Sequence, residues 1–207
     1  MEQARGRNNA KRNIIIFIIG TFLSFLAIVL PSIGIAAGID WMSFFILLGL
    51  VGVILEVIAI IGLRNVNKQY ANAMWALILM AILTVTSTVL SIVEAFNEGN
   101  KALSTASDWI SVGLELAEVL IVVNFVLGTN ELAKENDKGM PVLTKIIVYG
   151  YMGLFLISLA FKLLGFIPAI SENTIVTNTF GIVTLVLYII REIAYVFFLI
   201  KSLWRVQ

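Results

Sequence analysis

Six long apolar runs divide this 207-residue chain, and no other feature of the sequence restricts its fold so strongly. Each run reaches the roughly 20 mostly apolar residues that a helix needs to cross a bilayer. The runs are too long for strands and do not alternate in polarity. They cover residues 14–37, 42–63, 72–96, 109–129, 144–168 and 178–200. We therefore predict an all-α integral membrane protein, with six transmembrane helices in a single polytopic membrane domain over 1–207.

The composition excludes most other classes of protein. Sixty percent of the residues are hydrophobic and 13% are charged, against about 25% charged in an average soluble domain. A net charge of +1 gives no basic field that would hold nucleic acid. The chain has no Cys and no His, which removes thiol chemistry, the commonest zinc sites and Ser-His triads. We predict no enzyme activity, no cofactor and no metal centre.

The basic residues predict how the chain is oriented in the membrane. Segments that face the cytoplasm carry an excess of Lys and Arg. With the N-terminus inside, the only basic residue in the outer segments is Lys101. The inner segments hold Arg5, Arg7, Lys11, Arg12, Arg64, Lys68, Lys134, Lys138, Lys145, Lys201 and Arg205. We expect both termini to be cytoplasmic.

The first run has a second interpretation, because a basic start and an apolar run also describe a secretory signal peptide. The apolar stretch over 14–30 exceeds the roughly 7–15 residues of a signal-peptide core. This length favours a retained helix. The chain has no glycosylation sequon, which favours a multi-pass protein of the cell membrane, in particular a bacterial plasma membrane.

The six runs also form three consecutive hairpins, and short sequence echoes suggest a pseudo-threefold arrangement. An Asp-Trp pair opens the second and the fourth run, at 40–41 and 108–109, and every even run carries a Glu. Aligning the Asp-Trp pairs, however, places Glu56 opposite Asn124 rather than Glu118. A simpler explanation is therefore kept as an alternative to the repeat: membrane helices are built from few residue types, so short sequence matches between them are common.

Ionisable residues inside the runs are the strongest functional signal. Insertion of one at a helix centre costs about 2.5–3.5 kcal/mol, and such residues usually face the bundle interior or a wet cavity. The acidic ones are Glu56, Glu115, Glu118 and Glu192, and the basic ones are Lys162 and Arg191. Two carboxyl groups are left without a basic partner, and each of these must hold a proton or bind a cation.

The fourth run is the most polar and is expected to line a path or a site. Glu115 and Glu118 lie one turn apart on the same face, and Asn124 lies about a turn and a half further in. Arg191 is expected to pair with Glu118 or Glu56. Its chain neighbour Glu192 points about 100° away, so these two should each pair with another helix.

Lys162, near the outer end of the fifth run, has two interpretations. A Lys near a helix end can extend its ammonium to the interface. The alternative is an ion pair with Glu115 or Asp108, which both lie on the outer side.

Three functions fit these features. The first is a small transporter or channel for a proton, a cation or a small cationic solute. Its site residues would be Glu118, Glu115, Glu56, Arg191, Glu192 and Asn124. The second is a substrate-binding or assembly subunit of a larger membrane complex. Its size and hairpin layout are similar to those of the membrane-embedded substrate-binding subunits of vitamin importers, although no motif carries that likeness. The third is a static membrane scaffold.

The expected partners follow from these functions. They are the lipid bilayer, a small cation or solute, and a partner membrane protein or a second copy of the chain. Nucleic acid is not among them.

Overall fold

The computed structural model describes residues 2–37, 45–97, 101–135, 138–165, 167 and 174–205. Over these residues the chain folds into six α-helices and contains no strand. The helices are α1 (Glu2–Ala37), α2 (Ile46–Leu63), α3 (Lys68–Phe96), α4 (Lys101–Lys134), α5 (Pro141–Gly165) and α7 (Thr174–Leu203). The all-α prediction is confirmed for this part of the chain.

Five of these helices, all except α2, contain a stretch that is long and apolar enough to cross a membrane. At most 33% of the most apolar window in each stretch is buried inside the bundle. Large apolar side chains such as Ile82, Val85 and Ile175 are exposed instead. A soluble protein rarely exposes so much contiguous apolar surface, and a lipid bilayer is the environment that this surface fits.

α2 is the exception in length. The predicted run begins at residue 42, but 42–44 lie outside the described residues and the helix begins at Ile46. Its 18 residues extend about 27 Å at 1.5 Å per residue, slightly less than the roughly 30 Å of a hydrocarbon core. By length, then, five spans are supported and the sixth remains a prediction.

Several helices continue beyond the apolar runs into polar sequence. α1 begins at Glu2 rather than at residue 14, and α4 covers Lys101–Lys134 rather than 109–129. Hydropathy detects the apolar part of a helix, whereas backbone hydrogen bonding can continue into the polar residues that flank it. At the other extreme, α5 ends at Gly165, and residue 168 of the predicted run lies outside the described residues.

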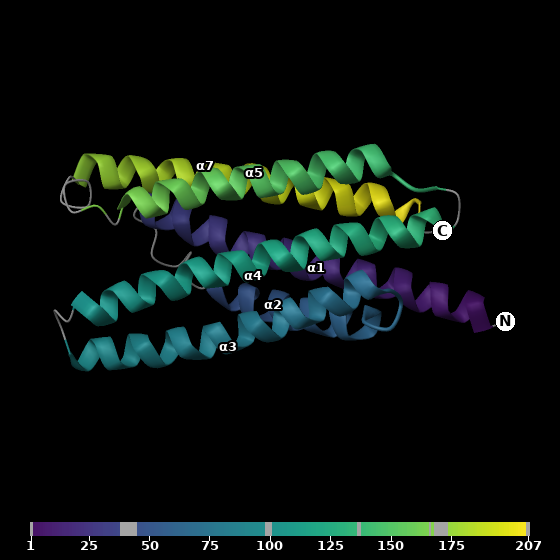
Figure 1. The fold of residues 1–207 in the computed structure, drawn as a ribbon, viewed down its shortest axis with the longest axis horizontal. Helices are drawn as coiled ribbons and strands as arrows, with labels where there is room; N and C mark the ends of the chain where they lie inside the picture. The colour runs from purple at the N-terminus through teal and green to yellow at the C-terminus, as the bar shows by residue number, and fades with distance from the viewer. Residues whose placement is uncertain are drawn as a thin grey trace.

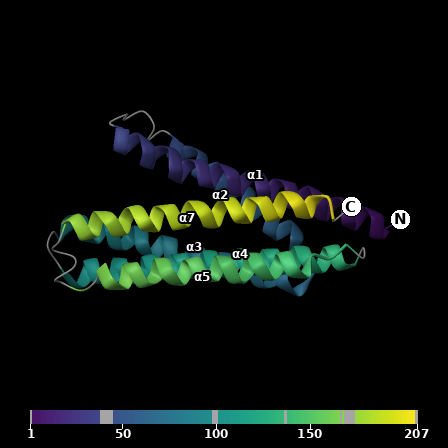
Figure 2. The same cartoon turned by 90° about the horizontal axis from the view of Figure 1, so that it is seen from above.

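Helices that follow one another in the chain lie side by side and run in opposite directions (Figure 1). The pairs α1–α2, α3–α4 and α5–α7 make the most extensive contacts. α2 also packs on α3, α4 on α5 and α7 on α1, so a ring closes in chain order, and α4 meets α7 across it. Both termini lie at one end of the bundle, which we call the terminal end (Figure 1 and Figure 2).

α1 and α2 approach each other closely at two glycines. A Cβ atom on Gly20 would lie 2.7 Å from the carbonyl oxygen of Gly52 and 2.9 Å from Cγ of Glu56. A Cβ atom on Gly52 would meet Ser24 at similarly short range. Small residues of this kind let two membrane helices bring their backbones together. This contact places Glu56 directly against α1.

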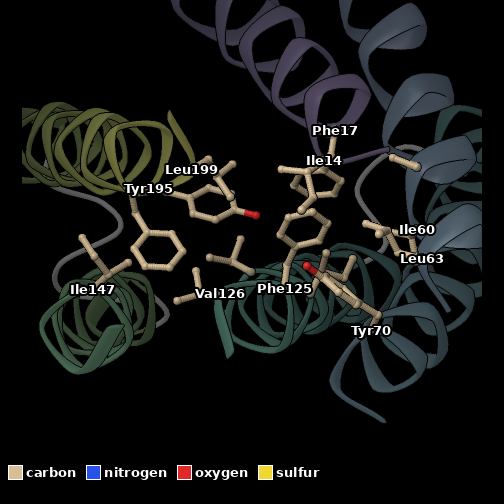
Figure 3. Packing of buried hydrophobic residues seen from close by; sticks show 14 of the residues in the cluster. Ile14, Phe17, Ile60, Leu63, Tyr70, Phe125, Val126, Ile147, Tyr195 and Leu199 are labelled. Atoms are coloured by element: carbon tan, nitrogen blue, oxygen red, sulfur yellow. The ribbon is translucent and has the colours of Figure 1, made fainter. Parts of the chain in front are cut away.

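The largest fully buried side chains lie toward the terminal end of the bundle, and Figure 3 shows how they pack. Phe17 of α1 stacks on Phe125 of α4, with ring centroids 3.8 Å apart. Tyr195 meets Phe17 edge-on, and Tyr70 meets Phe125 in the same way. We call the fully buried group here the terminal cluster: Ile14, Phe17, Ile60, Leu63, Tyr70, Phe125, Val126 and Leu199.

Candidate functional site

A cavity of about 260 Å³ lies inside the ring, on the side of the terminal cluster that faces away from the terminal end. Phe17 closes its near side, and Thr21, one turn further along α1, belongs to its wall. Three acidic side chains reach the cavity from three helices: Glu56 from α2, Glu118 from α4 and Glu192 from α7. The carboxyl groups of the three even-numbered runs therefore meet at one cavity.

Arg191 joins two of these carboxyl groups. Its Nη2 donates a hydrogen bond to Glu118 Oε1 at 3.0 Å, and its Nε lies 3.6 Å from Glu192 Oε1. The guanidinium also lies over the ring of Tyr151, 4.6 Å from the centroid, where the ring face attracts a cation. The Arg191 side chain is only 5% exposed, and these contacts offset the loss of water around its charge.

The Tyr151 hydroxyl lies between the same two carboxyl groups. It is 2.7 Å from Glu192 Oε1 and 3.2 Å from Glu118 Oε1. A tyrosine hydroxyl has one proton to donate and can accept another. It can therefore form a full hydrogen bond with each carboxyl group only when one of them is protonated and donates to it. This arrangement suits a proton shared by Glu118, Tyr151 and Glu192.

Glu56 faces the cavity from the opposite side. No Lys or Arg in the described part of the chain forms an ion pair with it. Thr21 and Ser24 of α1 present hydroxyl groups beside its carboxyl group. These two hydroxyl groups and that of Tyr195 are buried at the cavity wall. The surroundings of Glu56 are therefore polar although no basic side chain among the described residues pairs with it.

A second charge cluster lies further out on α4. Lys162 of α5 forms an ion pair with Glu115 and donates a hydrogen bond to Ser111 at 3.2 Å. This is one of the two pairings predicted from the sequence; the other candidate, Asp108, is exposed. The Lys162 and Glu115 side chains are 28% and 25% exposed, and neither lines the cavity.

Asn124 does not join the cavity residues. Its amide donates a hydrogen bond to the Leu120 carbonyl oxygen of its own helix at 2.7 Å, and the residue is absent from the cavity wall. The predicted site residues thus separate into the cavity acids with Arg191, the Lys162–Glu115 pair and a self-bonded Asn124.

The pairing of Arg191 agrees with the expectations from the sequence. Glu118 was one of its two expected partners, and the structure places the two side chains in contact. Arg191 and Glu192 pair only loosely, since Arg191 Nε lies 3.6 Å from Glu192 Oε1 and forms no hydrogen bond in the described part of the chain. Each of the two finds a closer partner on another helix: Arg191 bonds to Glu118 of α4, and Glu192 to Tyr151 of α5.

Sequence reasoning missed the hydroxyl groups of the site. Tyr151, Tyr188 and Tyr195 surround the carboxyl groups, and Arg191 also lies 5.2 Å from the ring centroid of Tyr188. The available signal was their position: each tyrosine lies within an apolar run rather than at its ends, and interfacial tyrosines belong at the ends.

No three acidic side chains in the described part of the chain come close enough together to ligate one metal ion. The three carboxyl groups are therefore spaced around the cavity rather than gathered at a point. The sequence matches no family model, no curated protein and no solved structure.

Proposed function

We propose that this chain is a small membrane transporter or channel that moves a proton or a small cation across the bilayer. The observation that carries the proposal is the meeting of Glu56, Glu118 and Glu192 at one cavity, where Arg191 contacts Glu118 from outside the cavity wall. The proposal includes all six spans, with both termini cytoplasmic, in a cell membrane of bacterial type.

The charge balance supports this function. Lys162 is matched by Glu115, so three carboxyl groups remain for Arg191. A buried carboxylate without a counter-ion is strongly unfavourable, and such a group takes up a proton or pairs with a cation instead. At most two positive charges are needed to neutralise the set, and these are the charges that we propose the protein carries.

The residues have distinct roles in this proposal. Glu118 binds the transported charge, because it faces the cavity and also contacts Arg191. Arg191 competes for Glu118 as a fixed internal cation, which allows the bound charge to leave. Tyr151 passes a proton between Glu118 and Glu192, and Glu56 provides a second acceptor across the cavity.

The cavity size favours transport over a static scaffold. A single buried water needs a volume of only about 10–15 Å³, and the cavity volume of about 260 Å³ is many times larger. Carboxyl groups kept only for helix register would pack against one another or against one water. The large acidic cavity is also compatible with a substrate-binding subunit, which the experiment below separates from a transporter.

The test is cation flux in liposomes that contain the purified protein. A pH-sensitive dye inside reports proton entry under a potassium diffusion potential, and a sodium-sensitive dye serves a parallel set. We expect flux above that of protein-free liposomes for the wild type and for Glu135→Gln, which removes an exposed carboxyl group at the end of α4. We expect flux at the protein-free level for Glu118→Gln.

Two results would overturn the proposal. One is the absence of proton and sodium flux in the wild type while its circular dichroism shows a folded helical protein. The other is a Glu118→Gln variant that folds and conducts as the wild type does. The first result would favour a binding subunit or a scaffold, and copurification of a partner would then be the next measurement.

A further inference from the structure

The central cavity contains one acidic group that no described basic residue balances. Arg191 contacts Glu118 and Glu192, and the Tyr151 hydroxyl can bond fully to both acids only when one of them holds a proton. With that proton, the two acids and the arginine carry no net charge. Glu56, which reaches the cavity from α2, forms no ion pair in the part of the chain that the structure describes. The positive charge that the cavity can still take therefore belongs at Glu56.

Two hydroxyl groups lie next to this acid. Thr21 and Ser24 are one turn apart on the face of α1 that lines the cavity, and they present their hydroxyl groups beside the Glu56 carboxyl group. A hydroxyl group that donates its proton to a carboxylate can still accept through its lone pairs. Glu56, Thr21 and Ser24 thus offer three oxygen acceptors at one end of the cavity.

An independent observation on α7 also points to a ligand. Tyr195 lines the cavity and is 1% exposed, and its hydroxyl group points toward α1 (Figure 3). This hydroxyl group forms no hydrogen bond with any described residue, whereas a buried hydroxyl group usually has a partner. A ligand with N–H groups in the cavity would give it one.

This set of acceptors selects a primary ammonium group. Such a group carries one positive charge and three N–H donors, as the lysine side chain does. Hard metal ions need several oxygen ligands at one point, and no three acidic side chains of the described residues gather in this way. A lipid chain offers the oxygen atoms around Glu56 no donor. The rest of the wall is largely apolar and aromatic, with Phe17, Ile121 and Val122 among its members, and suits an apolar body attached to the ammonium group.

We propose that the cavity binds a small primary amine in its charged form, with the ammonium group between Glu56 and the hydroxyl groups of Thr21 and Ser24. This inference rests on the proposed function and names its substrate class. The ammonium group is one of the two positive charges that the acidic set takes up, and the proton shared at Tyr151 is the other. The apolar body of the amine packs against Phe17 and its neighbours in the wall.

Equilibrium dialysis with radiolabelled 2-phenylethylamine tests the binding, with the full-length protein in detergent at neutral pH and protein-free micelles as the blank. The neutral competitor 2-phenylethanol has the same body. The trimethylammonium analogue of the probe keeps the charge and has no N–H group. We expect saturable binding of the amine, and each competitor should displace it only at a roughly tenfold or higher concentration than unlabelled amine does, because hydrogen bonds that involve a charged group are lost.

Three variants locate the site. Glu56→Gln should weaken binding roughly tenfold or more, because it removes the counter-charge. Thr21→Val keeps the shape of the side chain without its hydroxyl group and should weaken binding about three- to tenfold. The matched control is Thr86→Val on α3, which lies outside the cavity wall and bonds to the carbonyl oxygen of Ile82 in its own helix; it should bind as the wild type does. If Glu56→Gln does not fold, the Thr21→Val protein carries the test.

The inference is overturned if the wild type shows no saturable binding, if either competitor displaces the probe as well as unlabelled amine does, or if folded Glu56→Gln and Thr21→Val proteins bind like the wild type. Equal displacement by 2-phenylethanol would make the cavity a site for apolar molecules, lipid chains included. The two proposals can fail separately: proton or sodium flux without amine binding overturns only this inference, and amine binding without such flux overturns only the transport of inorganic cations.

Discussion

The two charge clusters of the bundle have opposite balances although they lie one helical turn apart on α4. In the outer cluster, Lys162 meets Glu115 one-to-one, and both side chains are about a quarter exposed. In the central cluster, the Arg191 side chain is 5% exposed and contacts the buried Glu192 and Glu118, whose side chain is 34% exposed. Glu56 faces the same cavity.

This difference separates two uses of charge in a membrane protein. A matched pair near a helix end is neutral as a unit and can join two helices without changing its charge state. An unmatched set in the interior must exchange protons or cations with its surroundings to stay neutral. The following experiments test this difference between the two clusters, in order of decreasing expected effect on stability.

The largest effect is expected from removing the two basic residues in turn. Arg191→Met leaves the buried carboxyl group of Glu192, and that of Glu118, without their cation and should lower the unfolding free energy by about 3–5 kcal/mol. Lys162→Met breaks a partly exposed pair and should cost about 1 kcal/mol or less. Titration with sodium dodecyl sulfate, followed by circular dichroism, measures both values. Equal losses would mean that the clusters do not differ as described.

The second effect concerns the hydroxyl group that joins the central carboxyls. Tyr151→Phe removes hydrogen bonds to two acidic groups and should cost roughly 1.5–3 kcal/mol in the same titration. The matched control is Tyr149→Phe on the same helix, where the side chain is exposed and the change should stay within about 0.5 kcal/mol. If the two variants unfold alike, the Tyr151 hydroxyl does not link the carboxyl groups.

The third effect concerns the contact that holds Glu56 in the central cluster. Gly20→Ala adds a methyl group against the Gly52 carbonyl and the Glu56 side chain, and should destabilise the protein by about 1–3 kcal/mol. Gly150→Ala meets open space on α5 and should be neutral or stabilising by up to about 1 kcal/mol. Thermal unfolding in detergent distinguishes them, and a stable Gly20→Ala protein would show that α1 and α2 separate easily.

The smallest effect is expected at Asn124. Among the described residues its amide bonds to the backbone of its own helix alone, so Asn124→Ala should change the unfolding free energy by less than about 0.5 kcal/mol. Liposome flux should also match that of the wild type. A flux loss as large as that of Glu118→Gln would support the expectation from the sequence that Asn124 is a site residue of the proposed transporter.

The helices and the candidate ionic partners could be predicted from the sequence. Both depend on free energies that are large and that are set by residues near one another in the chain. Burying a lone charge is so costly that Arg191 and Lys162 had to find acids, and position along the helix restricted the candidates to a few. The hydroxyl groups of Tyr151 and Thr21 were not predictable in the same way. A tyrosine or threonine inside an apolar run is tolerated without a partner, so its environment depends on how whole helices pack.

The close approach of α1 and α2 was also beyond the sequence. Glycines are common in membrane helices, and nothing in the chain distinguishes Gly20 and Gly52, which meet a neighbouring backbone, from Gly150, which meets nothing. The position of Glu56 depends on that distinction. Helix boundaries differed for a simpler reason, since α1 and α4 continue as helices after the apolar sequence ends.

The stacked Phe17 and Phe125 rings have a consequence for the proposed transport. They lie between the acidic cavity and the terminal end in a layer of fully buried apolar groups, where an unsolvated ion would face a barrier on the order of 20 kcal/mol. Under that proposal, passage of an ion would have to wait for the helices to rearrange, and collective motions of helices take microseconds to milliseconds. A protein that works in this way would turn over as a carrier, with a rate that saturates with concentration, rather than conduct as an open pore.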